Sequence, residues 1–300
     1  MKLLPAALAC ALYLCVPSVV FADPVPDPIV RLITEAARTG NPATLATAVD
    51  LSKKTNPRSV AEIDALVAGL KTDAESARVA KVREQGFFEG WSGEGEVGAS
   101  LTTGTSKNTN VAVGATLAKD GIDWRHKIIA SANYQRSNGT TTANRYLASY
   151  EADYKFTARL FALGLVQWEQ DKFAGFNRRF TESPGLGYSI LTGPEVNWQV
   201  SGGPAWRQTK FVTQRSENDT SARLGTLLLW NISPATVFSE DGGAYLGGSD
   251  NTYFSTTALT TKILGDLSAR VSFNVSVESK PPPGITGTST ISRFTLVYSF

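Results

Sequence analysis

The pattern of apolar and polar residues changes its period near Trp91, and this change divides the chain into two regions. From Trp91 onward, apolar and polar residues alternate singly over long segments. In the clearest segment, Tyr146, Ala148, Tyr150, Ala152, Tyr154 and Phe156 alternate with Arg145, Leu147, Ser149, Glu151, Asp153 and Lys155. One apolar face and one polar face are what a strand between two different solvents requires, so the pattern predicts β-strands.

The lengths of these segments favour a membrane barrel over a soluble sandwich. They run to roughly 10–15 residues, which suits tilted membrane strands. Short connections (119–121, 155–157, 192–194, 232–234 and 264–266) alternate with longer polar ones (102–109, 137–144, 171–177, 213–221, 241–251 and 280–290). Short periplasmic turns and long outer loops are typical of outer-membrane proteins. The fold predicted for residues 89–300 is therefore all-β, a transmembrane antiparallel β-barrel of about 12 strands.

Residues 23–88 show a helical period instead. Asp27-Pro28, Asn41-Pro42 and Asn56-Pro57 each place a capping side chain before a proline suited to the first helical position. Apolar residues then recur at helical spacing, and the third helix extends to about Glu84. We expect a small α-helical region in the periplasm, because an even number of strands leaves both barrel ends on that side. Its thin apolar stripes leave open a role in binding a periplasmic partner.

The first apolar run predicts export. Lys2 precedes an apolar stretch from Leu3 to Phe21, and Ala22 ends a small-x-small cleavage site, so residues 1–22 read as a signal peptide. The alternative, an N-terminal anchor helix, is opposed by two prolines within the run. Export would place the protein in the cell outer membrane of a Gram-negative bacterium.

The end of the chain carries a second targeting pattern. Phe294, Leu296, Tyr298 and Phe300 share one face of the last strand, and the sequence stops at Phe300. A terminal aromatic after alternating apolar residues resembles the insertion signal of outer-membrane proteins. We therefore expect the barrel-assembly machinery as a partner during insertion, and outer-membrane lipid and lipopolysaccharide as the surroundings.

Composition excludes several kinds of chemistry. With 29 Lys+Arg against 27 Asp+Glu there is no basic footprint for nucleic acid. Both cysteines lie within the predicted signal peptide, so the mature chain would have no thiol for a disulfide or a metal. With one histidine and no calcium-loop pattern, we expect no cofactor and no metal site.

The polar faces of the predicted strands give candidates for the barrel lumen. These are Glu94, Glu96, Arg145, Glu151, Asp153, Lys155, Arg270, Glu278 and Arg293. Two interpretations stay open: the charges line a small passive pore, or they pair across the interior as a packed polar plug. A binding or structural module, acting through the outer loops or the periplasmic helices, is the alternative function.

An enzyme is the least supported hypothesis. A hydrolase with a serine nucleophile needs a histidine base nearby, and His126 is the sole histidine. It sits between Arg125 and Lys127 at the start of a predicted strand, at the periplasmic rim. We therefore expect no catalytic residues and no enzyme activity.

Four segments of the barrel region resemble one known family. They are Trp91-Ser92-Gly93-Glu94-Gly95-Glu96, Tyr150 to Phe156, Ser183-Pro184-Gly185-Leu186-Gly187-Tyr188 and Leu296-Val297-Tyr298-Ser299-Phe300. Together they are similar to the DUF481 family, described as salt-induced outer-membrane proteins, over about residues 91–300. The resemblance implies the location and the barrel architecture. It suggests an envelope role under salt or osmotic stress, and it carries over no catalytic residues.

Overall fold

The structure is a computed structural model that describes residues 24–102, 108–248 and 250–300. The chain divides into two compact units, Met1–Glu75 and Ser76–Phe300, which are described separately. The predicted signal peptide, residues 1–22, lies outside the described residues. The predicted boundary between residues 88 and 89 stays a prediction.

The first unit is helical, as the period of its sequence predicts. It holds α1 (Asp27–Arg38), α2 (Pro42–Thr55) and the first part of α3 (Val60–Glu84). Ile33 and Ile63 are completely buried. An ion pair of 2.5 Å between Lys53 and Asp64 links α2 to α3. None of the described helices is long and apolar enough to cross a membrane.

One of the three predicted caps is confirmed and two are wrong. Asn41 precedes α2, and its side chain accepts hydrogen bonds from the backbone N–H groups of Ala43 and Thr44. Asp27 instead lies inside α1, after Pro26 at the capping position. Asn56 closes α2 by donating to the carbonyl of Ser52. A capping residue before proline therefore marks a helix boundary here without deciding on which side of it the helix lies.

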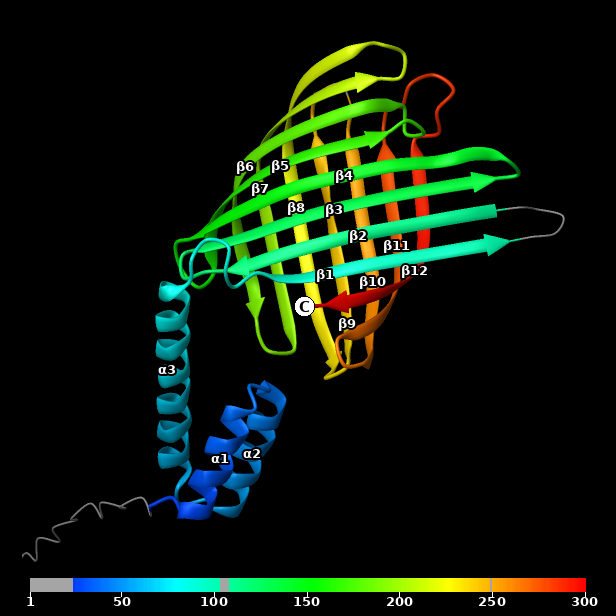
Figure 1. Cartoon of the computed structure of the whole chain (residues 1–300). Helices are drawn as coiled ribbons and strands as arrows, with labels where there is room; N and C mark the ends of the chain where they lie inside the picture. The colour runs from blue at the N-terminus through cyan, green and yellow to red at the C-terminus, as the bar shows by residue number, and fades with distance from the viewer. Residues whose placement is uncertain (1–23, 103–107, 249) are drawn as a thin grey trace, which may run out of the picture. The chain divides into compact units, whose positions relative to one another are not determined.

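The second unit contains a closed antiparallel barrel of 12 strands, which confirms the fold predicted from the alternating pattern (Figure 1). The strands on one half are β1 (Ser92–Thr102), β2 (Asn108–Asp120), β3 (Trp124–Ser137), β4 (Thr140–Lys155), β5 (Leu160–Asp171) and β6 (Phe176–Thr192). The others are β7 (Val196–Phe211), β8 (Ser216–Ser233), β9 (Thr236–Leu246), β10 (Thr252–Leu264), β11 (Leu267–Glu278) and β12 (Thr288–Ser299). Each strand pairs with its sequence neighbours.

The first and last strands close the barrel. β1 pairs with β12 in a register that runs from Glu94 opposite Ser299 to Val97 opposite Leu296. Gly93 and Phe300 exchange two backbone hydrogen bonds, of 2.8 and 2.9 Å. Closure removes the free edges that would otherwise leave rows of backbone groups unpaired.

The predicted short turns are confirmed, whereas three of the six predicted long loops are wrong because strands extend well into them. The stretch 137–144 was expected to be a loop, but β3 and β4 are joined by Asn138 and Gly139 alone, both with positive φ. Asn-Gly is a typical two-residue hairpin turn, and its pairing extends both strands. β8 and β9 likewise extend well into the stretches 213–221 and 241–251. Polar residues near this rim therefore belong to strands that face water on both sides, and 279–287 is the longest connection described there.

Alternate side chains give the barrel an apolar outer wall. Many of its aromatic residues lie near the two strand ends: Trp124, Trp198, Trp230 and Tyr298 toward the short turns, and Tyr134, Trp168, Trp206 and Tyr253 toward the other rim. Between them lie exposed aliphatic side chains such as Val113, Leu186 and Leu259. Two aromatic girdles around an apolar band are the features of a membrane-facing surface.

Glycine permits a close approach of β6 and β7. A Cβ placed on Gly203 would lie 2.2 Å from the carbonyl oxygen of Pro184 and 2.6 Å from the Cα of Gly185. Both contacts are with backbone, which cannot rotate away as a side chain can. Glycine is therefore required at position 203 for these two strands to keep their spacing.

We expect Gly203→Ala to destabilise the barrel by about 1–3 kcal/mol, because the added methyl group forces the two strands apart. The measurement is urea unfolding in detergent micelles, followed by tryptophan fluorescence. Gly164→Ala is the matched control, since a Cβ at Gly164 meets no atom within 4 Å. Equal stability of the two variants would contradict the required close approach.

Candidate functional site

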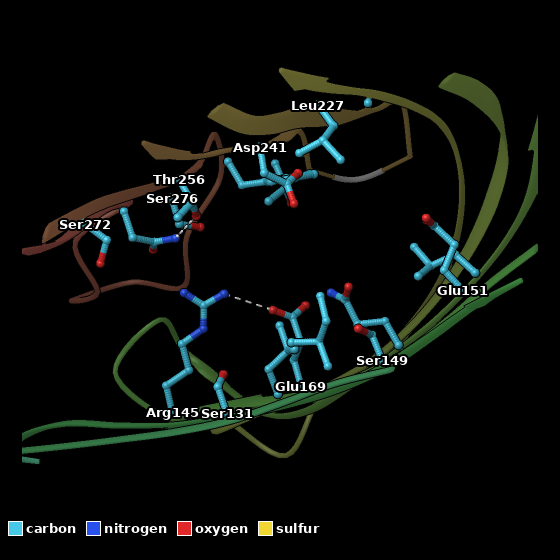
Figure 2. Close-up of a pocket in the computed structure, with 18 of the residues that line it drawn as sticks. Ser131, Arg145, Ser149, Glu151, Glu169, Leu227, Asp241, Thr256, Ser272 and Ser276 are labelled. Atoms are coloured by element: carbon cyan, nitrogen blue, oxygen red, sulfur yellow. Dashed lines mark hydrogen bonds and ion pairs between the residues drawn. The ribbon is translucent and has the colours of Figure 1, made fainter. Parts of the chain in front are cut away.

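The interior of the barrel is the candidate functional site. It holds a cavity of about 720 Å³ whose lining comes from all 12 strands and includes charged, hydroxyl, amide and apolar side chains. Figure 2 shows Arg145, Ser131 and Glu169 from one side of the wall facing Asp241, Thr256 and Ser272 from the other. Polar side chains thus converge on a shared space, as the alternating pattern requires once the sheet closes.

Toward the short-turn rim, one arginine binds two carboxylates. Arg270 on β11 donates to Glu94 at 2.7 Å and to Glu96 at 3.1 Å, both on β1. It also donates to the hydroxyl of Thr260 at 2.9 Å. Its guanidinium therefore links β10, β11 and β1 from inside the wall.

A second arginine is held at the same end. Arg125 on β3 donates from Nε to Asp153 on β4 at 2.7 Å. The guanidinium also lies over the ring of Phe161, 5.0 Å from its centroid, and reaches Gln199 on β7 at 3.3 Å. Asp153 is almost completely buried, so this ion pair is shielded from bulk water.

Toward the other rim, two buried ion pairs lie in adjoining parts of the wall. Arg145 on β4 pairs with Glu169 on β5 at 3.1 Å. Arg179 on β6 pairs with Glu278 on β11 at 2.6 Å, and Thr252 donates to the same carboxylate at 2.8 Å. Glu169 lies opposite Arg179 in the register of β5 and β6, which brings the two pairs together.

Some of these contacts cross the interior. Arg179 and Glu278 belong to β6 and β11, which β7 to β10 separate in the wall. Arg223 on β8 reaches Glu151 on β4 at 3.8 Å, and these strands are also far apart in the barrel order. Side chains that meet from non-adjacent strands narrow the passage between them.

The structure brings most of the predicted lumen residues to the cavity. Glu94, Glu96, Arg145, Glu151, Arg270, Glu278 and Arg293 line it. Asp153 is buried beside Arg125. Lys155 lies instead at the short-turn rim, where it binds Asp120 at 2.5 Å and the carbonyl of Gly121 at 2.9 Å.

Other charged residues of the interior were not singled out from the sequence. They are Arg125, Lys127, Glu169, Asp171, Arg179, Arg207, Arg223 and Asp241. Arg178 and Arg179 both belong to β6. The register of β6 shifts between Phe176 and Arg178, and an irregular register prevents alternation from deciding which arginine points inward. For the residues on regular strands, counting every second position would have found them.

The single histidine faces away from the cavity. His126 is stacked between Trp124 and Tyr150 on the outer wall, with ring centroids at 6.0 and 6.1 Å. Its Nδ1 lies 2.9 Å from the hydroxyl of Tyr150, and Phe87 and Trp91 contact the same ring. Its neighbours are those of an interfacial aromatic cluster, and no serine hydroxyl is bonded to it. Among the described residues, no cluster of histidine and carboxylate groups has the arrangement of a metal site.

The predicted insertion residues lie on the outer wall. Phe294, Leu296, Tyr298 and Phe300 are all exposed there, and the rings of Tyr298 and Phe300 stack at 6.5 Å. They share one face of the last strand, as the alternation predicts. Their role as an insertion signal stays a prediction.

Two connections at the loop rim are joined by hydrogen bonds. The carboxylate of Asp250 accepts from the Ser279 hydroxyl at 2.8 Å and from the backbone N–H of Lys280 at 2.7 Å. Partial burial acts to raise the pKa of Asp250, but the hydrogen bonds that Ser279 and Lys280 donate outweigh it and hold the pKa below its ordinary value. These bonds tie the connection after β9 to the end of β11.

The ion pairs inside the wall differ in exposure, and this difference can be tested. We expect Glu278→Ala to destabilise the barrel by about 3–5 kcal/mol, because it leaves the buried Arg179 guanidinium without its carboxylate. Asp120→Ala is the matched control, since its partner Lys155 lies at a rim where Asp120 is largely exposed. There the expected loss is below about 1 kcal/mol. Urea unfolding in micelles measures both, and equal losses would contradict a buried pair.

Comparisons with known proteins agree with the barrel. Residues 95–300 match the family "Protein of unknown function, DUF481". The chain is 24% identical over 180 residues to the uncharacterized protein YdiY of Escherichia coli strain K12, covering 60% of this chain and 71% of that protein.

Solved barrels are similar at low identity. They include the NanC porin (12% identity, 69% of this chain and 98% of that chain, TM-score 0.42). The COG4313 outer membrane channel from Pseudomonas putida F1 follows at 11% identity, 70% and 95% coverage, and a TM-score of 0.45. The KdgM porin has 11% identity, 70% and 99% coverage, and a TM-score of 0.39. At these scores no role of those proteins is carried over to this chain.

Proposed function

This chain belongs to the DUF481 family of proteins of unknown function, and we propose that it is an outer-membrane barrel that acts as a narrow passive pore for small polar solutes. The proposal places the barrel in a Gram-negative outer membrane and the helical region in the periplasm. The observation that carries it is a cavity of about 720 Å³, lined by charged and hydroxyl groups together with apolar side chains, inside a closed wall whose outer face is apolar.

The outer wall supports the membrane location. Exposed apolar side chains cover the strands, and exposed tryptophan side chains lie toward both ends. Exposing such a surface to water costs free energy, whereas exposing it to lipid does not. A closed barrel also leaves no unpaired strand edge inside the bilayer.

The lining of the cavity supports passage of polar solutes. A barrel with no transport role can fill its interior with apolar side chains, as small barrels do. Here glutamates, arginines and hydroxyl groups from many strands line a shared cavity, together with apolar side chains such as Phe161 and Leu165. Charged groups kept facing an open cavity are the chemistry of a hydrophilic path.

The pairs that cross the interior favour a narrow pore and also support a second function. If Arg179–Glu278 and Arg223–Glu151 close the path completely, the barrel is a structural or binding module that acts through its rims or its helices. An envelope role under salt or osmotic stress fits either function and rests on the family resemblance.

Cell fractionation tests the location. We expect the full-length chain in the outer-membrane fraction, and we expect it to migrate faster on a gel before boiling than after, because a closed barrel resists unfolding by detergent. N-terminal sequencing of the exported protein checks whether the predicted signal peptide has been cleaved. Recovery of the folded protein in the soluble periplasm would contradict the membrane location.

Planar bilayers test the pore. We expect discrete small conductances from the wild-type barrel and larger ones from the double variant Arg179→Ser/Glu278→Ser, which removes the pair that spans β6 and β11. Removing both partners leaves neither member of this pair buried without its counterpart, so the double variant should fold. Asp120→Ser/Lys155→Ser, at the rim, is the matched control and should conduct as the wild type does. Silent bilayers with both the wild type and the widened variant would favour the structural module.

A further inference from the structure

Arg207 on β7 is a buried cation whose Nε has no hydrogen-bond acceptor among the described residues. Its side chain lines the cavity and is 6% exposed. A buried guanidinium with unused donors costs free energy, because the water it lost has not been replaced.

The neighbouring Arg179, by contrast, has hydrogen-bond acceptors for its guanidinium within the wall. Its guanidinium lies 4.0 Å from the centroid of the Phe176 ring. Its Nη1 donates to Glu278 at 2.6 Å, and its Nε donates to Thr209 at 3.3 Å. Both of these N–H donors of Arg179 are therefore bonded to acceptors within the protein.

Arg207 has the same aromatic support but not the acceptors. Its guanidinium lies over the ring of Tyr245 on β9, 4.6 Å from the centroid. Stacking uses the face of the guanidinium, whereas all of its N–H donors point outward in its plane. The ring covers one face of the guanidinium, and Nε in its plane has no acceptor among the described residues.

We propose that Arg207 forms an oxyanion-binding subsite in the lumen, which takes a small carboxylate or phosphate anion. Two parallel N–H···O bonds from one guanidinium match the geometry of both groups. The proposal deepens the proposed pore and rests on it for its meaning in the cell, because a lumenal site serves solutes that enter the lumen.

The charges around Arg207 suit transient binding. Glu169 and Glu278 lie within electrostatic reach of it, and each is already bound by another arginine, Arg145 or Arg179. These carboxylates limit how tightly a further anion binds. A solute that must also leave requires a site that binds it only moderately.

Arg293 on β12 is a weaker candidate for the same role. Its Nε is also buried without a partner. However, its side chain is less buried than that of Arg207, and no aromatic ring supports its guanidinium among the described contacts. Arg207 is therefore the residue on which we base the site.

Titration of inorganic phosphate into the refolded full-length barrel in detergent micelles, followed by calorimetry, tests the site. We expect saturable binding to the wild type and about tenfold weaker binding to Arg207→Gln, which loses a charge-assisted bidentate contact. Arg207→Lys keeps the charge but not the planar fork, so it should recover only part of the affinity. Arg136→Gln is the matched control: it removes one arginine from an exposed position at the loop rim, and binding should not change.

The outcomes separate this site from the pore. Gel migration before boiling establishes that each variant is folded. Phosphate binding that depends on Arg207 in a barrel that does not conduct would support the site and overturn the pore. A conducting barrel that binds no phosphate, or binds it equally in Arg207→Gln, would overturn the site and leave the pore standing.

Discussion

Closure of the sheet is the constraint on which the rest of this structure depends. In lipid, every backbone N–H and C=O group must find a partner within the protein, and a barrel achieves this only if its first and last strands pair. Here β1 and β12 pair from Glu94 to Val97, and the reciprocal bonds between Gly93 and Phe300 continue the seam. Without this seam, two strands would present free edges, and the distinction between inside and outside would be lost.

Closure also decides the chemistry of each face. Once the wall is continuous, one set of alternate side chains meets lipid and the other meets its counterparts across the interior. Arginines and carboxylates far apart in sequence then become neighbours, as Arg179 and Glu278 do. Their pairing stabilises the folded barrel and narrows its lumen at the same time, so in the proposed pore the same side chains would set both conductance and stability.

Arg207 differs from these arginines, which are paired with carboxylates. The other interior arginines that touch an aromatic ring, Arg125 and Arg179, also bind a carboxylate. Arg207 is held by Tyr245 alone. A wall selected only for stability would have little use for a buried guanidinium without an acceptor. This argument, and not a likeness to other barrels, is what singles out the residue.

The sequence by itself determined the barrel, the number of its strands and the helical region, because side-chain alternation and helical spacing are local properties that one chain segment reveals. It did not decide the extent of the strands at the loop rim, since polar residues there face water whether they lie in strands or in loops. Register was also hidden: an irregularity near Phe176 decides that Arg179 faces inward. The partners of the lumen charges could be identified only from the closed tertiary structure. Pairs such as Arg179 and Glu278 depend on how distant strands meet across the interior.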